Sequence, residues 1–109
     1  MRKNEYNSID EFKKQYIGIW APSDGHWYGL DFIYNQTEYR LQTGKMYSDE
    51  KDAMFGLYRK RVASEYGNND YILLAQFDDM NTLLDSSVID NRKFSEIIID
   101  DNTELVGQD

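Results

Sequence analysis

The sequence predicts a mainly β fold with a minor α component. A short N-terminal helix precedes an antiparallel meander of about six strands, which forms a curled sheet or a small barrel. Apolar and polar residues alternate along several short segments, as in strands with one buried face, and glycines fall mostly at the turns between them. Aromatic residues make up 15 % of the 109 residues. That supplies large rings for one core, so we expect residues 1–109 to form a single domain.

The first element is marked by a helix-start signal. Ser8 is followed three residues later by Glu11, the spacing of a capping box in which the serine hydroxyl accepts from an amide of the first turn. A helix is therefore predicted over residues 8–16. A short strand over residues 17–21 follows, and it ends at the turn-forming Pro22-Ser23-Asp24-Gly25.

The clearest alternation lies in residues 28–34 and 38–45, which are separated by the polar Asn35-Gln36-Thr37. Two alternating segments joined by so short a polar link are typical of an antiparallel hairpin. One face of this hairpin would carry Tyr28, Leu30, Phe32 and Tyr34 from the first segment and Tyr39, Leu41 and Thr43 from the second.

Three further strands are predicted, over residues 54–63, 71–77 and 94–99. The segment 71–77 is the most apolar of them, and we expect it at the centre of the sheet. Residues 80–89 fit either a short helix or a strand, and both interpretations stay open. We expect the tail that follows the last strand to fray.

Charge is distributed very unevenly along the chain. Residues 1–63 hold ten Lys or Arg and nine Asp or Glu, whereas residues 64–109 hold only two basic residues and eleven acidic ones. The second part therefore has a net charge of −9 in a chain whose total is −8. Such a field repels nucleic acid and anionic lipid and attracts basic protein surfaces.

The charge pattern predicts a non-catalytic binding protein that docks on a basic surface of another protein. Toxin-neutralising immunity proteins and nucleic-acid mimics that inhibit nucleases act in this way, with carboxylates in the positions of phosphates. No direct binding to nucleic acid or membrane is expected. The competing interpretation is that the acidity serves solubility alone. The expected partner-binding residues are Asp78, Asp79, Asp85, Asp90, Asp100, Asp101, Tyr66 and Tyr71.

Catalytic and metal sites are poorly supported. His26 is the only histidine and would be a general base oriented by Asp24. No Ser or Cys nucleophile motif accompanies it, so we expect an exposed turn residue and no enzyme activity. The acidic pairs Asp78-Asp79 and Asp100-Asp101 lack the alternating ligands of a calcium loop. We therefore predict no metal and no cofactor.

Two other features bear on compartment and on the sheet edge. The chain has no cysteine, and no apolar run approaches the length of a membrane span or a signal peptide, so a cytoplasmic location is expected. Arg59-Lys60-Arg61 is the one basic cluster. We interpret it as part of a solvated edge strand, where charge discourages further pairing.

Residues 12–47 resemble the opening of lipocalins and of the wider calycin group, especially small bacterial lipocalin-like domains. Gly18-Ile19-Trp20 matches the Gly-x-Trp of their first strand, and the hairpin that follows matches their next two strands. The resemblance implies a reduced barrel or half-open sheet, with Trp20 at its floor, and binding in place of catalysis. It supports the alternative of a carrier for an apolar or aromatic ligand. Its expected pocket residues are Trp20, Tyr28, Leu30, Phe32, Leu41 and Leu74.

Overall fold

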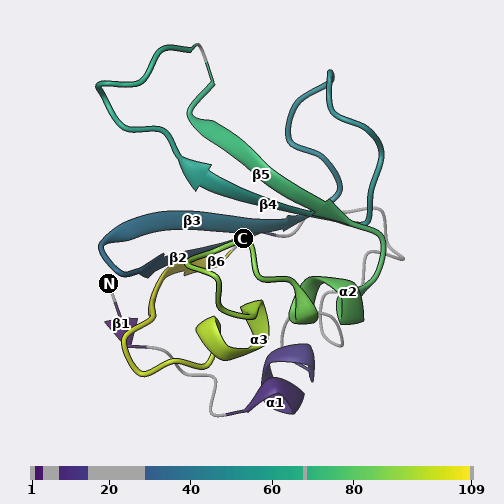
Figure 1. Ribbon diagram of the computed structural model, residues 1–109, viewed down its shortest axis with the longest axis vertical. Helices are drawn as coiled ribbons and strands as arrows, with labels where there is room; N and C mark the ends of the chain where they lie inside the picture. The colour runs from purple at the N-terminus through teal and green to yellow at the C-terminus, as the bar shows by residue number, and fades with distance from the viewer. Residues whose placement is uncertain (1, 4–7, 15–28, 68, 109) are drawn as a thin grey trace.

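The computed structural model describes residues 2–3, 8–14, 29–67 and 69–108 (Figure 1). Six antiparallel strands form one sheet in the order β1-β6-β2-β3-β4-β5. The elements are β1 (Arg2–Lys3), α1 (Ile9–Lys13), β2 (Gly29–Tyr34), β3 (Thr37–Thr43), β4 (Phe55–Lys60), β5 (Tyr71–Phe77), α2 (Met80–Asp85), α3 (Phe94–Ile97) and β6 (Glu104–Gln108). Within the described chain β1 and β5 are the two edges and do not pair, so the sheet is open. The mainly β class is confirmed.

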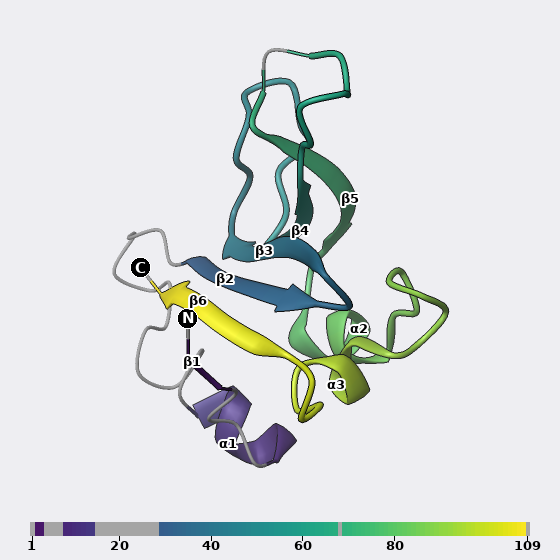
Figure 2. The same cartoon turned by 90° about the vertical axis from the view of Figure 1, so that its left-hand side faces the viewer.

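The three helices lie on one face of a strongly twisted sheet (Figures 1 and 2). Strands β2 to β5 pair in chain order and form the predicted meander. The hairpin of β2 and β3 is confirmed, with Tyr34 opposite Thr37. Asn35 and Gln36 form its turn with φ angles of 52° and 66°. Two left-handed residues in succession match the strand twist, as in the type I′ turns of short hairpins.

Helix α1 begins where the capping signal places it. The Glu11 amide donates to the Ser8 hydroxyl at 3.2 Å, which satisfies one of the unpaired amides of the first turn. The helix runs over Ile9–Lys13, and its Phe12 is fully buried. The predicted strand over residues 17–21, with Trp20, and the candidate base His26 lie outside the described residues.

The hydrophobic core fills the space between the helices and the inner face of the sheet. Phe94 of α3 is its central ring, because its centroid lies 6.1 Å from that of Phe12 and 6.0 Å from that of Phe32. Phe32 in turn stacks on Tyr39 at 5.5 Å. The remaining buried apolar residues of this core are Leu30, Tyr34, Leu41, Phe55, Leu57, Phe77, Leu83, Leu84, Ile89, Ile97, Ile98 and Leu105.

The outer face of the sheet depends on two glycines. A Cβ atom at Gly56 would lie 2.6 Å from Cε1 of Tyr58, and one at Gly29 would lie 2.1 Å from Nη2 of Arg40. Both distances are far below van der Waals contact. The phenol ring of Tyr58 and the guanidinium group of Arg40 therefore lie close against backbone that only glycine leaves open.

Two predictions for the C-terminal part are wrong. Residues 94–99 do not form a strand: α3 spans Phe94–Ile97, and the Ile98 amide donates to the Phe94 carbonyl at 3.0 Å. The tail does not fray, because β6 pairs with β2 and its Leu105 is buried. The tail is mostly polar, but side chains alternate between the two faces of a strand. Pairing with β2 therefore brings the apolar Leu105 into the core, which holds the tail in place.

Two predicted positions within the sheet are also wrong. The apolar β5 is an edge strand and not a central one, and β4 with its basic cluster is an interior strand and not an edge. Two of the three cations of the cluster are ion-paired with carboxylates. Lys60 lies 3.3 Å from the Glu38 carboxylate, and Arg59 lies 2.7 Å from Glu65. Paired charges at the end of a strand do not prevent another strand from pairing beside it.

Candidate functional site

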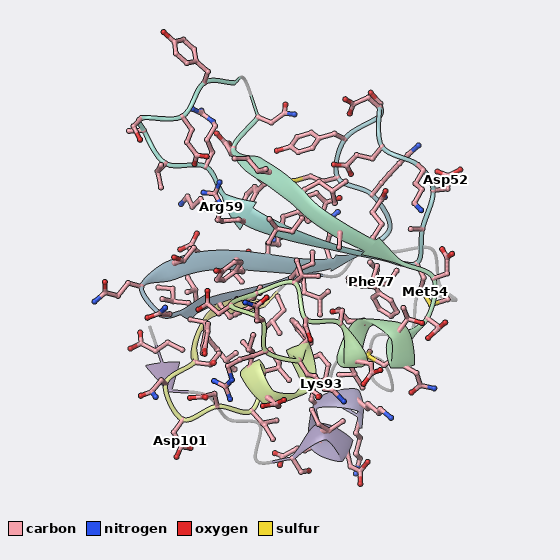
Figure 3. All side chains as sticks on the ribbon, in the orientation of Figure 1. Asp52, Met54, Arg59, Phe77, Lys93 and Asp101 are labelled. Carbon is pink, nitrogen blue, oxygen red and sulfur yellow. The ribbon has the colours of Figure 1, made fainter. Side chains whose placement is uncertain are left out.

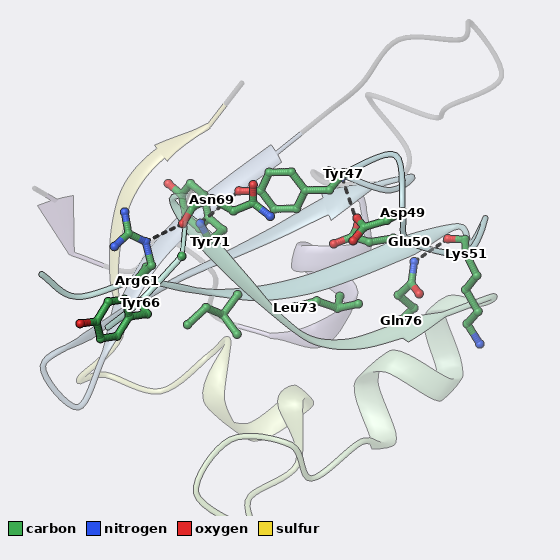
Figure 4. A pocket seen from close by; sticks show the side chains of 12 residues that line it. Tyr47, Asp49, Glu50, Lys51, Arg61, Tyr66, Asn69, Tyr71, Leu73 and Gln76 are labelled. Carbon is green, nitrogen blue, oxygen red and sulfur yellow. Dashed lines mark hydrogen bonds between the residues drawn. The ribbon is translucent and has the colours of Figure 1, made fainter. Parts of the chain in front are cut away.

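An open pocket of about 520 Å³ lies along the outer side of β5 (Figure 4). Two loops form its other walls: residues 44–54, which join β3 to β4, and residues 61–70, which join β4 to β5. We call it the β5 pocket. Its lining comprises Tyr47, Asp49, Glu50 and Lys51 from the first loop, Arg61, Tyr66, Gly67 and Asn69 from the second, and Tyr71, Ile72, Leu73 and Gln76 of β5.

The first loop is anchored by the carboxylate of Glu50. Its Oε1 accepts from the amides of Met46 and Tyr47 at 3.0 and 3.2 Å and from the Tyr58 hydroxyl at 2.5 Å. Tyr58 is fully buried, and burial, with the hydrogen bond to Glu50, raises the pKa of its phenol far above the usual value. Tyr58 is thus a neutral donor that holds the loop against the sheet.

We predict that Tyr58→Phe lowers the free energy of unfolding by about 1–3 kcal/mol. The Met46 amide donates both to the Tyr58 hydroxyl at 2.9 Å and to Glu50 at 3.0 Å, so the substitution removes one of the two acceptors of this amide and one of the three donors to Glu50. Urea unfolding followed by circular dichroism measures the loss. Tyr66→Phe is the matched control because Tyr66 is fully exposed, and it should change stability by less than about 0.5 kcal/mol. Equal stabilities of the two variants would contradict the anchoring role.

The second loop is anchored by a bidentate ion pair. Arg59 donates to both carboxylate oxygens of Glu65 at 2.8 and 2.7 Å, and the Val62 amide donates to the same carboxylate at 3.0 Å. The hydrogen bond from Arg59, followed by that from Val62, lowers the pKa of Glu65 to about 2. Arg61 closes the loop by donating to the carbonyls of Asn69 and Glu65 at 2.6 and 2.9 Å.

The lowered pKa of Glu65 predicts a dependence of stability on pH. A carboxyl group that binds its proton more weakly in the folded state stabilises the fold above its unfolded pKa of about 4.5, and this contribution is lost as the pH falls toward about 2. Glu65→Gln should therefore flatten the decline in urea midpoint across this range. Asp79 and Asp100 also have lowered pKa values, so a smaller decline should remain. An unchanged profile would contradict the assignment.

Three of the predicted carboxylates gather around α2, and we call Asp78, Asp79 and Asp85 the α2 acids. Asp79 caps the helix and accepts from the Thr82 amide at 2.7 Å, which lowers the pKa of its carboxyl group. Asp85 lies 3.0 Å from Lys93, yet its side chain is 76 % exposed. Asp78 is exposed beside the end of β5. Lys93 is the only cation of the described chain that is ion-paired with this group.

The other three predicted carboxylates lie elsewhere. Asp90 accepts from the Asn35 side chain at 3.2 Å, beside the turn between β2 and β3. Asp100 is ion-paired with Arg92 at 2.8 Å. The exposed Asp101 lies on the opposite side of the molecule from Phe77, the residue before Asp78 (Figure 3). The structure thus separates the α2 acids from the other three carboxylates.

Both predicted tyrosines line the β5 pocket. Tyr66 is fully exposed at its rim, and Tyr71 is half-buried, with burial raising the pKa of its phenol. Sequence reasoning missed Tyr47, Glu50 and Tyr58. One signal was available. Tyr58 lies on the opposite face of its strand from Phe55 and Leu57, and an aromatic ring on that face needs another segment to cover it.

Four of the residues expected for a carrier lie in the main core or against it. Leu30, Phe32 and Leu41 are fully buried in the main core, and Leu74 packs against it. Phe32 contacts the ring of Phe94 in α3. Trp20 and Tyr28 lie outside the described residues.

The chain matches no protein-family model, no curated protein and no solved structure. In the part of the chain that the structure covers, no three His, Asp or Glu side chains gather as a metal site requires. None of the described helices is both long and apolar enough to cross a membrane. Charge, exposure and the geometry of β5 are therefore the features that bear on function.

Proposed function

We propose that this chain is a non-catalytic binding protein that docks on a basic surface of a partner protein through the α2 acids and the adjoining edge of β5. The observation that carries the proposal is the exposed charge of the α2 acids, of which Lys93 offsets only one. Fixed, exposed carboxylates accelerate encounter with a basic surface and orient the partner.

The tyrosines of the β5 pocket extend the same docking surface. Strand β5 runs from Tyr71, which lines the pocket, to Phe77, which directly precedes Asp78. One strand therefore connects an aromatic region with an acidic one. Tyrosine rings bury a large area at little entropic cost and are frequent anchors of protein interfaces.

We further propose an inhibitor or immunity type of action, in which the carboxylates occupy positions that phosphates take in the partner's own complexes. A partner such as a nuclease or a toxin that acts on nucleic acid would then be blocked. Electrostatic mimicry of this kind needs acidic groups held on folded elements. Helix α2, which Asp79 caps, is one such element.

Affinity capture on the immobilised full chain tests the proposal. A basic protein should be retained from a lysate of the producing cells and released by a rising salt gradient, because screening weakens interactions between exposed charges. A single-stranded DNA oligonucleotide should compete for the released protein. Retention without competition would contradict the mimicry, and the absence of any salt-released basic protein would contradict the docking itself.

A further inference from the structure

We propose that the free edge of β5 binds an extended segment of the partner as an additional strand. This inference rests on the proposed function and names the element that the partner presents. Main-chain hydrogen bonds would give affinity, and the β5 pocket would receive side chains of the added segment.

The backbone groups of β5 point alternately toward β4 and toward the free edge. The Arg61 amide donates to the Asp70 carbonyl at 2.8 Å. In an antiparallel ladder, hydrogen-bonded and non-hydrogen-bonded pairs alternate. The next pair, Tyr71 opposite Lys60, is therefore non-hydrogen-bonded, and the amide and carbonyl of Tyr71 point away from β4.

The same orientation applies further along β5. A β-bulge adds a residue opposite Tyr58, so that Leu73 pairs with Tyr58 and the next pair is Ala75 with Leu57. The backbone groups of Gly56 point toward β3. The amide and carbonyl of Gln76, which lies opposite Gly56 in the pair of β4 and β5, therefore also point toward the free edge. In the described chain β5 has no second neighbouring strand. Leu73 and Gln76 therefore present unpaired backbone groups.

A tyrosine side chain already lies at the free edge of β5, where the added strand would pair. The Tyr71 amide donates to the hydroxyl of Tyr47 at 3.1 Å. This oxygen occupies the position of a carbonyl from a neighbouring strand, which shows that an acceptor outside the sheet reaches this edge. Figure 4 shows Tyr47 reaching from its loop toward Tyr71.

The composition of β5 also favours pairing at its free edge. Residues 71–76 are all partly exposed, and β5 contains no charged residue and no proline. Natural sheets usually protect an exposed edge with such residues, with a bulge or with a covering segment. Of these features β5 has its bulge and a partial cover from the pocket loops, in which Tyr47 reaches the Tyr71 amide and the Gln76 side chain donates to the Lys51 carbonyl at 2.7 Å. An apolar edge with so little protection is suited to pairing.

Charge identifies the occupant as a segment with basic ends. Asp70 precedes β5, and Asp78 and Asp79 follow it. A second copy paired antiparallel about the middle of β5 would place Asp70 of one chain opposite Asp78 of the other, and directly opposed like charges are destabilising. An apolar, extended partner segment flanked by Lys or Arg would instead form opposite-charge pairs at both ends.

The test begins with a displayed library of random peptides selected on the immobilised full chain. We expect selected peptides to be rich in β-branched and aromatic residues with Lys or Arg at their ends. A synthesised peptide should slow hydrogen exchange of the Leu73 and Gln76 amides by about tenfold or more, since these groups become hydrogen-bonded. Methylation of alternate peptide nitrogens should abolish binding. The Leu57 amide, already paired inside the sheet, is the internal control.

The outcomes separate this inference from the proposed function. If no peptide is enriched, or if the selected peptides leave Leu73 and Gln76 exchange unchanged, strand addition is wrong. If such peptides still lose affinity with Asp78→Lys, acidic docking survives without strand addition. If Leu73 and Gln76 are protected while affinity ignores both salt and Asp78→Lys, strand addition holds and acidic docking is wrong.

Discussion

Replacing Asp78 with lysine and Asp79 with asparagine is expected to weaken docking on the partner by about 100-fold. The new lysine would face the basic surface of the partner, and like charges brought together at an interface cost several kcal/mol. Asparagine caps a helix about as well as aspartate does, so the second substitution removes charge while α2 keeps its start. Titration calorimetry with the captured partner measures the dissociation constant.

The matched control is Asp101→Lys with Asp90→Asn, which makes the same change in net charge outside the α2 acids. Both residues are exposed: Asp90 accepts from Asn35 beside the turn between β2 and β3, and Asp101 lies on the opposite side of the molecule from Phe77 (Figure 3). This control should weaken docking by less than about tenfold through the long-range field alone. Equal losses in both variants would mean that net charge matters and position does not, which would contradict an interface at α2.

Replacing Phe94 with alanine is expected to lower the free energy of unfolding by about 3–5 kcal/mol. The ring is 1 % exposed and contacts the rings of both Phe12 and Phe32, so its removal opens a cavity between α1, α3 and the sheet. Urea unfolding gives the value. Val88→Ala, at a site 39 % exposed, should change stability by less than about 0.5 kcal/mol. A loss below about 1 kcal/mol for Phe94→Ala would contradict the central place of this ring.

The hairpin of β2 and β3 could be predicted because all of its determinants are local. Leu30 and Phe32 alternate with residues of the outer face, and the two turn residues lie directly between the strands. Local alternation and turn chemistry act over a few residues, so sequence reasoning reaches them.

Helix α3 was mistaken for a strand because the run Ile97-Ile98-Ile99 is rich in β-branched residues. Phe94, Ile97 and Ile98 are the buried positions, and their spacing of three and four residues is that of a helical face. Burial in the tertiary core outweighed the intrinsic preference of isoleucine for strands.

The order of strands in the sheet depended on pairing between distant segments. Strand β6 joins β2 across more than half of the chain, with Leu105 opposite Phe32, and no local pattern encodes such a partner. Strand β5 is apolar at an edge because the two loops of the pocket and α2 shield it in part. Apolar composition alone therefore did not show that β5 is an edge.

The binding role of the candidate residues stays a prediction. Tyr66 and Tyr71 both line the β5 pocket, and the α2 acids lie on and directly before one helix. The separation of the α2 acids from the other three carboxylates could not be read from the sequence, since it follows from where α2 and α3 pack on the sheet. The anchoring of the loop by Glu50 and Tyr58 depends on a contact eight residues apart that carries no sequence motif.

We expect the α2 acids to bind a basic partner surface. The most direct measurement is the dissociation constant of the purified complex as a function of NaCl concentration, for the wild-type chain and for Asp78→Lys with Asp79→Asn. We expect the wild-type affinity to fall steeply with salt and the variant to show a weaker affinity with a shallower slope. Equal slopes for the two proteins, or a wild-type affinity independent of salt, would contradict the claim.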